Sequence, residues 1–479
     1  MPRIYFTFLF RLVPTLVLAA SILLPIIAKA KPARLVVTNA LLLTLADGDK
    51  TPFRGHLVVA PDGTIAAIGP GEPESGAWTA AETMEANGRW IMPGFVSAHS
   101  HLWQSAYRGL ASDQTLMGWV DALYLKRAMR APPEDFYWFT LHGALDHLRH
   151  GITGAYNFNY GGWREGDFAR EQFRAEVASG IRFVHGYNVG RMDGDRTVEA
   201  ATTRLRAFLA WIETQRATSP GLLSVMLNGA AAFTNGPEQS HLESALMRQF
   251  GLGNHLHYLE SPPEKWEEQA RFRWFLDAGL VTDKVIFGHF IHVTPFILEE
   301  TVKAEAGMSW NPLSNGRLAS GTPDIVGYRK AGLRIGLGVD GQASADIADP
   351  FENMRAGLYA VRAREEDATV LSPYQVARMH TLGAAEVLGA ESRIGSLETG
   401  KQADFLVLDP GDFGPIFDPW ASLVFVGTTR QIVEVRVGGE CLVRDDQPVR
   451  HDWANLRAEV AKRVATNITL GPIPSNHSH

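Results

Sequence analysis

The sequence contains almost no cysteine, since Cys441 is the only one among 479 residues. An internal disulfide and a metal site made of several thiolates are therefore excluded. The sequence also lacks an excess of positive charge, because its formal net charge at pH 7 is −7. We therefore expect no nucleic-acid partner. Any metal ion must be held by histidines and carboxylates.

Long apolar runs are also lacking, except near the N-terminus. Arg3 and Arg11 precede the apolar run Leu12–Ile27, which is followed by Ala28-Lys29-Ala30. A basic start, a short apolar core and an Ala-x-Ala sequence are typical of a signal peptide. We predict that residues 1–30 are a signal peptide and that the protein is exported, either periplasmic or secreted. An uncleaved anchor is the alternative, but the run is short for a membrane span, so we expect no stable span in the mature chain.

Short β-rich segments occur at both ends of the chain, separated by turn signals such as Asp-Gly. These segments are Leu35–Leu45, His56–Ile68, Ala403–Asp409, Ser422–Gly427 and Ile432–Val443. We predict that they form one small β-sandwich domain, with residues 31–92 as its N-terminal half and residues 391–450 as its C-terminal half. The two halves would bracket a central domain.

The central part of the chain alternates strand-like and helix-like segments. The strand candidates are Gly94–His101, Ile152–Tyr160, Gly180–Val189, Leu222–Ala230, Asn254–Glu260, Lys284–Phe290, Ala306–Pro312 and Leu333–Gly341. Eight strand–helix units over about 250 residues are typical of a (β/α)8 TIM barrel. We therefore predict an α/β fold with a barrel over residues 93–390, followed by a C-terminal helix and tail over residues 451–479.

Helical periodicity marks the segments between several of these strands. These segments are Glu171–Ala178, Val198–Thr214, Pro263–Ala278 and Pro323–Lys330. Ser372 and Pro373 predict the start of a later helix, because serine is a favourable N-cap and proline fits the first helical position. Gly389 suits the end of that helix.

Two histidines alternate in the stretch "PGFVSAHSHLWQSAYRG", which begins at Pro93. Side chains two residues apart on a strand point to the same face, so His99 and His101 could bind one metal ion together. They could equally be two solvated histidines on an exposed strand edge. The pair alone does not decide between these interpretations.

The ends of three later strand candidates also carry polar side chains. His257 and Glu260 lie at the end of the fifth strand, His289 at the end of the sixth and Asp340 at the end of the eighth. The C-terminal ends of barrel strands meet at one face, where the active sites of TIM barrels lie. We therefore expect these groups to converge with the histidine pair. Core packing alone does not explain polar residues at the same end of several strands.

These motifs resemble those of the amidohydrolase superfamily, and within it the group of cytosine deaminases, chlorohydrolases and S-adenosylhomocysteine deaminases. "MPGFVSAHSH" is similar to the first-strand metal motif, "HYLE" to the fifth-strand His-x-x-Glu, "GHFIH" to the sixth-strand Gly-His and "GVDG" to the eighth-strand aspartate. "WNPLSNGRLASG" resembles the seventh-strand motif, and "RIGSLETGKQADFLVLD" the return into the β domain. The motifs occur in the expected order over nearly the whole chain after the signal.

The resemblance implies the roles of the site residues. It makes His99, His101, His257 and Asp340 the ligands of one divalent metal ion, with zinc favoured and iron or manganese as alternatives. The catalytic residues would be Glu260 as proton shuttle, His289 as the group that polarises the attacked centre, and Asp340, which contacts water as well as metal.

A single metal ion is favoured over two. Binuclear members of the superfamily usually bridge two ions with a carboxylated lysine on the fourth strand. Between His101 and His257 the only lysine is Lys126, and it lies in a helix-like segment before the second strand. The fourth strand candidate, Leu222–Ala230, contains neither lysine nor a carboxylate.

Five residues are candidates for substrate binding. Trp103, Gln104 and Arg108 follow the first ligands, and His185 lies near a strand end. Gln104 could form two-way hydrogen bonds to a heterocycle or an amide, although packing of this segment on the barrel rim is an equal alternative. Trp310 stands where many relatives carry a histidine, so their substrate contacts cannot be transferred directly.

The resulting hypothesis is a metal-dependent hydrolase that acts on C–N bonds of a small-molecule substrate through metal-activated water. A deaminase or aminohydrolase of a small molecule, with heterocycles among the candidates, is the first interpretation. The alternative is an exported amidase, carbamate hydrolase or peptide-type hydrolase. A binding protein without turnover is disfavoured because it would need no proton shuttle at Glu260. A homo-oligomer is compatible with the resemblance.

Overall fold

The computed structural model describes residues 1–2, 30–46, 51–160, 166–189 and 197–469. Most of the predicted signal peptide therefore lies outside the described residues. Within the described part, no helix combines the length and the apolar character needed to cross a membrane.

A parallel sheet of nine strands forms the centre of the molecule. Its strands are β6 (Phe95–His101), β7 (Ile152–Asn157), β8 (Arg182–Asn188), β9 (Leu222–Gly229), β10 (Gly253–Tyr258), β11 (Val285–His289), β12 (Gly307–Trp310), β13 (Arg334–Leu337) and β14 (Asp340–Gly341). Each strand pairs with the next in sequence from β6 to β13, while β14 pairs with β6. Because only Gly338 and Val339 separate β13 from β14, the sheet curls back onto its first strand. All eight predicted central strands are present.

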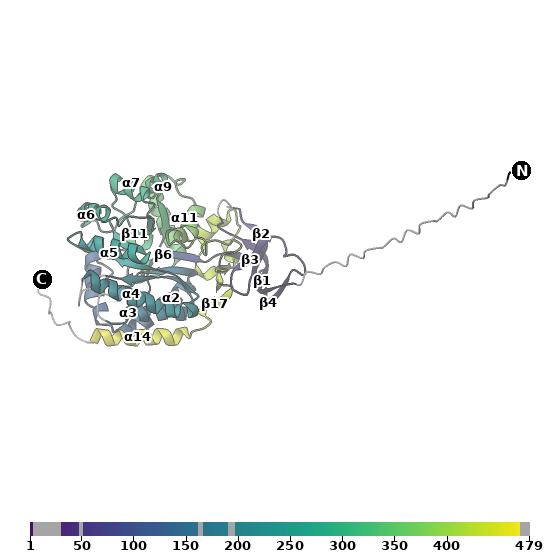
Figure 1. The fold of residues 1–479 in the computed structure, drawn as a ribbon, viewed down its shortest axis with the longest axis horizontal. Coiled ribbons are helices and arrows are strands. Elements are labelled where there is room, and N and C mark those ends of the chain that lie inside the picture. The colour runs from purple at the N-terminus through teal and green to yellow at the C-terminus, as the bar shows by residue number, and fades with distance from the viewer. Residues whose placement is uncertain (3–29, 47–50, 161–165, 190–196, 470–479) are drawn as a thin grey trace.

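Helices follow most of the central strands, as the alternating pattern predicts. They are α2 (Pro133–Arg149), α3 (Phe168–Ser179), α4 (Val198–Gln215), α5 (Glu238–Phe250), α6 (Lys265–Asp277), α7 (Pro295–Lys303), α8 (Pro312–Arg317), α9 (Ile325–Ala331), α10 (Pro350–Glu365), α11 (Pro373–Met379) and α12 (Leu382–Val387). The C-terminal helix α14 (Trp453–Thr469) runs along α2 (Figure 1). Its Arg463 pairs with Glu134 and Asp135 at the start of α2.

A second sheet of nine strands combines segments from both ends of the chain (Figure 1). The N-terminal strands are β1 (Lys31–Leu42), β2 (Phe53–Val59), β3 (Ile65–Pro70), β4 (Trp78–Glu85) and β5 (Trp90–Pro93). The C-terminal strands are β15 (Phe405–Leu408), β16 (Ile432–Val437), β17 (Glu440–Arg444) and β18 (Gln447–Pro448). The halves meet where β5 pairs with β15 in antiparallel orientation. Hydrogen bonding thus joins both ends in one continuous sheet.

The predicted strand Ser422–Gly427 is wrong, because these residues form the short helix η8 (Ser422–Val426) after α13 (Pro419–Ala421). The Asp418 side chain accepts hydrogen bonds from the backbone N–H groups of Trp420 and Ala421 and so caps this helix. A short apolar run does not distinguish a buried helical turn from a buried strand. The signal that decides here is the Asp-Pro pair before the run.

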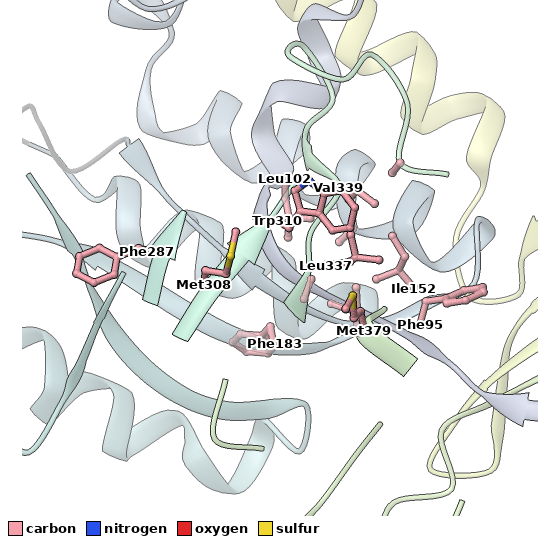
Figure 2. Packing of buried hydrophobic residues seen from close by; sticks show 14 of the residues in the cluster. Phe95, Leu102, Ile152, Phe183, Phe287, Met308, Trp310, Leu337, Val339 and Met379 are labelled. Carbon is pink, nitrogen blue, oxygen red and sulfur yellow. The ribbon is translucent and has the colours of Figure 1, made fainter. Parts of the chain in front are cut away.

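Buried hydrophobic side chains pack along the strands of the parallel sheet (Figure 2). Phe183 on β8, Phe287 on β11 and Met308 on β12 are fully buried, and Trp310 and Leu337 are buried where β12 and β13 end. Burial of such side chains contributes the main favourable free energy of folding. This packing holds the strand ends, which carry the polar side chains described next.

Candidate metal centre and active-site cavity

Four strands bring six polar side chains together at their C-terminal ends. His99 and His101 alternate along β6, which places both on one face of the strand. His257 comes from β10 and His289 from β11. The remaining two are Asp340, on β14, and Glu260, two residues beyond β10. All six side chains are buried.

The ligand atoms converge on one point. The His101 Nε2 atom lies 3.2 Å from His257 Nε2 and 3.2 Å from Asp340 Oδ1, and His99 Nε2 lies 3.3 Å from the same oxygen. One ligand atom each of His99, His101 and His257 lies within 4.8 Å of the others, and the same holds for His99, His289 and Asp340. His99 Nε2 is buried without a hydrogen-bond partner among the described residues. A buried nitrogen lone pair facing other ring nitrogens and a carboxylate fits a divalent cation.

Hydrogen bonds on the opposite ring nitrogens support metal binding through Nε2. His101 Nδ1 lies 2.8 Å from the Phe158 carbonyl oxygen, so it donates there and leaves Nε2 free. His99 Nδ1 lies 3.0 Å from His255 Nε2. Burial lowers the pKa of His99 to about 3 and holds the pKa of His257 well below its usual range. Both rings are therefore neutral near pH 7, as metal ligands must be.

The carboxylate of Asp340 stays ionised despite its burial. Burial raises its pKa, but the rings of His101 and His99 beside the carboxylate, together with the charge of His289, outweigh this effect and hold the pKa well below the usual range. The backbone of Asp340 has φ of +58° and that of His289 has φ of +67°. Non-glycine residues rarely adopt this left-handed region, and such strain concentrates at functional sites.

Glu260 and His289 form a second pair beside the ligands, with 3.5 Å between Glu260 Oε2 and His289 Nε2. Burial raises the pKa of Glu260 to about 7, and the negative charge of Asp340 adds to this effect. Burial lowers the pKa of His289, but the carboxylates of Glu260 and Asp340 outweigh it and raise the pKa above its usual value. A carboxyl group with a pKa near 7 can both accept and donate a proton at neutral pH.

A cavity of about 580 Å³ opens beside these residues. His101, His257, Glu260, His289 and Asp340 line one part of it, and the rest of the lining is mostly apolar. A volume of this size suits a small organic molecule, since ligand cavities typically measure roughly 300–1,000 Å³.

The five predicted substrate-binding residues do not line this cavity. Gln104 is fully buried and donates to the Tyr124 hydroxyl at 2.6 Å, so it supports a wall residue from behind. Arg108 forms an ion pair with buried Asp146. His185 Nδ1 lies 2.8 Å from the Glu176 carboxylate.

The two predicted tryptophans are also held inside the protein. Trp103, in the short helix η1 (Leu102–Tyr107), packs against Tyr124 and Phe136. Trp310 is buried within the core (Figure 2). This packing corresponds to the rim alternative considered for the segment after His101.

Sequence reasoning missed two residues that orient the site. His255 precedes His257 by two positions on β10 and therefore shares its face, which brings it to His99. Its signal was present, because "HLH" repeats the His-x-His spacing of β6. Asn315 accepts a hydrogen bond from His289 Nδ1 at 2.8 Å. No spacing rule points to Asn315, because it reaches His289 from α8 on a different strand–helix unit.

Comparisons with known proteins agree with this geometry. A model described as the amidohydrolase family matches residues 90–442. The 5-methylthioadenosine/S-adenosylhomocysteine deaminase of Symbiobacterium thermophilum is 29% identical over 448 residues, which cover 90% of this chain and 98% of the relative. The 5′-deoxyadenosine deaminase of Methanosarcina mazei is 27% identical, covering 90% of this chain and 97% of the relative.

Solved structures share the fold at lower sequence identity. An adenosine deaminase from Xanthomonas campestris with bound zinc has a TM-score of 0.80 and 24% identity, covering 92% of this chain and 100% of that chain. An atrazine chlorohydrolase from Arthrobacter aurescens complexed with zinc has a TM-score of 0.76 and 20% identity, covering 90% and 100%.

Proposed function

Because this chain belongs to the amidohydrolase family, we propose that it is an exported, single-zinc deaminase that releases ammonia from an amino-substituted heteroaromatic small molecule. The predicted enzyme class is confirmed: the chain is a hydrolase of carbon–nitrogen bonds other than peptide bonds, in a metal-dependent family. Two relatives that align over nearly their full length are named as deaminases of adenosine derivatives, and these names support a heteroaromatic substrate.

The observation that carries the proposal is the placement of Glu260 and His289 beside four metal-binding side chains. His99, His101, His257 and Asp340 would hold the ion, and three imidazoles with one carboxylate suit zinc. When bound, such an ion would lower the pKa of water to about 7 and so supply a nucleophile at neutral pH. The absence of a lysine from β9 supports one ion rather than two.

The chain's own residues handle the proton and the developing charge. Glu260 accepts a proton from the attacking water and delivers it to the amino nitrogen, so that the carbon–nitrogen bond breaks and ammonia leaves. The ring of His289, held by Asn315 through Nδ1, directs Nε2 toward Glu260 and Asp340. From there it can donate to the attacked centre and stabilise negative charge that develops in the transition state.

The proposal is tested by metal analysis and by ammonia release from a panel of amino-substituted heterocycles. We expect about one zinc ion per chain, ammonia release from at least one heterocycle, and no amine release from simple amides or carbamates. Glu260→Gln should retain zinc but lose at least about 100-fold in kcat, because it cannot transfer the proton. Two ions per chain, or amine release from amides alone, would contradict the proposal.

Export and domain organisation are further parts of the proposal. The basic start, the apolar run and the Ala-x-Ala sequence within residues 1–30 support export. Cell fractionation with N-terminal sequencing should find the mature chain outside the cytoplasm, beginning near Lys31. The sheet shared by both chain ends supports a small β domain beside a closed barrel.

A further inference from the structure

The cavity wall beyond the metal-binding residues has a distinct composition. It includes Leu116 and Val120 of α1 (Leu116–Val120), Leu242 of α5 and Leu318 after α8. The cavity of about 580 Å³ therefore has one ionisable end and one apolar end. A flat ring reacting at the first end would place its substituent against the second.

Among the described lining residues, acidic and imidazole side chains occur only at the metal end. Among the lining residues that the structure describes, the ionisable side chains other than tyrosines are His101, His257, Glu260, His289 and Asp340. Neither lysine nor arginine occurs in that part of the lining. Within the described residues, the apolar end thus offers no cation to pair with a substrate carboxylate.

Three uncharged polar residues of the wall direct hydrogen-bond donors to other protein groups and not into the cavity. The Thr234 hydroxyl donates to the carbonyl oxygens of Ala231 and Gly236 at 3.1 and 3.2 Å. The Ser344 hydroxyl donates to the Gly341 carbonyl oxygen, and the Gln239 amide donates to Glu243. A carboxylate buried here would lose its water without gaining a charged partner among the described lining residues, which is strongly unfavourable.

We propose that the cavity selects amino-substituted heteroaromatics that carry an uncharged, apolar substituent and rejects those whose substituent ends in a carboxylate. This inference rests on the proposed deaminase function and makes its substrate class narrower. An apolar substituent replaces water along Leu116, Val120 and Leu242, which favours binding in proportion to the area buried. The preference for an uncharged substituent therefore follows from the apolar wall of the cavity and not from the metal-binding end.

Three ligands test the proposal on the zinc-loaded full chain. 5′-Methylthioadenosine and S-adenosylhomocysteine share adenosine and a thioether sulfur, but only the second ends in an amino acid. 5′-Butylthioadenosine matches the longer tail without its charges. We expect kcat/KM for both uncharged compounds to exceed that for S-adenosylhomocysteine by at least about 100-fold, because the buried carboxylate finds no partner. Equal or higher kcat/KM for S-adenosylhomocysteine would overturn the proposal.

Binding separates failure of this inference from failure of the proposed function. Calorimetry on the zinc-loaded Glu260→Gln variant should give the same order of affinities without turnover. If no ammonia is released but this order holds, the deaminase function fails while the inference stands. If the charged compound binds as tightly as the others, or if none of the three binds, the inference is wrong.

A variant of the wall tests the cause of the selectivity. Leu116→Arg places a cation at the half-buried start of α1, where it should raise the relative affinity for S-adenosylhomocysteine by about 10-fold. Leu116→Met is the matched control and should leave the preference unchanged. If Leu116→Arg has native zinc content but the same preference for uncharged ligands, the apolar wall is not the cause of the selectivity.

Discussion

Each histidine of the metal site can use one ring nitrogen as a ligand only if its other nitrogen holds the proton. The contacts of His101 with the Phe158 carbonyl oxygen and of His99 with His255 serve this purpose. Asn315 likewise fixes the proton of His289, which lies beside the ligands, on Nδ1, since the amide oxygen of Asn315 can only accept. Residues that never touch the ion thus determine which atoms face it.

Replacement of Asn315 should therefore affect turnover more than metal content. Asn315→Leu removes the acceptor for His289 Nδ1–H, so we expect kcat to fall about 10- to 100-fold, as is usual for such supporting partners. Asn315→Asp keeps an acceptor and adds a charge, which should shift the pH profile upward by stabilising protonated His289. Steady-state kinetics with metal analysis measures both variants. Equal kcat for Asn315→Leu and the native enzyme would exclude this positioning role.

The buried residue His380 should make stability depend on pH. Its Nδ1–H donates to the Val96 carbonyl oxygen, and Asn353 donates to its Nε2, so the ring is neutral. Burial lowers its pKa to about 4 from 6.5. Between these values the unfolded chain binds a proton that the folded chain does not, so the free energy of unfolding falls as pH decreases from 6.5 to 4.

Replacement of His380 isolates this contribution. The difference in unfolding free energy between the native protein and His380→Gln should shrink by up to about 3 kcal/mol as pH falls across this window. Urea unfolding at several pH values measures it. The exposed residue His241 is the control for a histidine-to-glutamine change, and His241→Gln should leave the free energy of unfolding at pH 7 within about 0.5 kcal/mol of the native value. A constant difference between native and His380→Gln would refute the assignment.

Residues that face the metal site could be predicted from the sequence, whereas the residues that support them from behind could not. The convergence of the polar side chains on β6, β10, β11 and β14 follows from strand periodicity and from the rule that strand ends converge, while their roles were implied by the family resemblance. The residues that hold their opposite nitrogens depend on which loops and helices approach each strand end. For the same reason Trp103 and Gln104, which follow the ligands directly in sequence, turned into the core and not toward the cavity.

At the scale of elements, local signals predicted helix starts better than helix continuity. Ser372 caps α11 in a capping box with Gln375, as its position before Pro373 indicated. The helix then stops at Met379, and α12 begins at Leu382, so Gly389 ends a second helix and not the first. His380 and Thr381 separate the two helices. The His380 ring donates a hydrogen bond to the Val96 carbonyl oxygen, and this tertiary contact favours the break at that position.

The capping box should contribute measurably to stability. Ser372→Ala removes the acceptor for the Gln375 backbone N–H, and we expect a loss of about 1 kcal/mol in the free energy of unfolding. Ser372→Thr keeps the hydroxyl and should restore most of it. Chemical denaturation distinguishes the two, and identical values for alanine and threonine would show that the cap is energetically silent.

At the scale of the whole molecule, one buried ion pair joins the two sheets. Arg182 begins β8 of the parallel sheet, and Asp404 directly precedes β15 of the mixed sheet. Arg182 Nε lies 3.0 Å from Asp404 Oδ2, and a second guanidinium nitrogen lies 3.1 Å from Oδ1. Sequence patterns do not reveal this link, because 222 residues separate the partners.

Breaking this pair should lower the free energy of unfolding more than the loss of a surface ion pair would, because the Arg182–Asp404 pair attaches the mixed sheet to the parallel sheet. Asp404→Leu leaves the Arg182 charge buried and unpaired, and we expect a cost of about 3–5 kcal/mol. The double variant Arg182→Met with Asp404→Leu removes both charges and should recover most of that loss. Glu213→Ala, which breaks an exposed pair with Arg216, should change stability by less than about 1 kcal/mol.

Urea unfolding followed by near-ultraviolet circular dichroism shows whether the sheets separate. If the ion pair couples them, the native protein unfolds in one transition and Asp404→Leu splits it in two, because the mixed sheet loses its buried anchor to β8. The double variant should return to one transition, since two apolar side chains can pack where the pair lay. Equal stability of Asp404→Leu and the double variant would mean that the buried charge is not the cause, and that the β5–β15 pairing and the surrounding apolar contacts alone hold the sheets together.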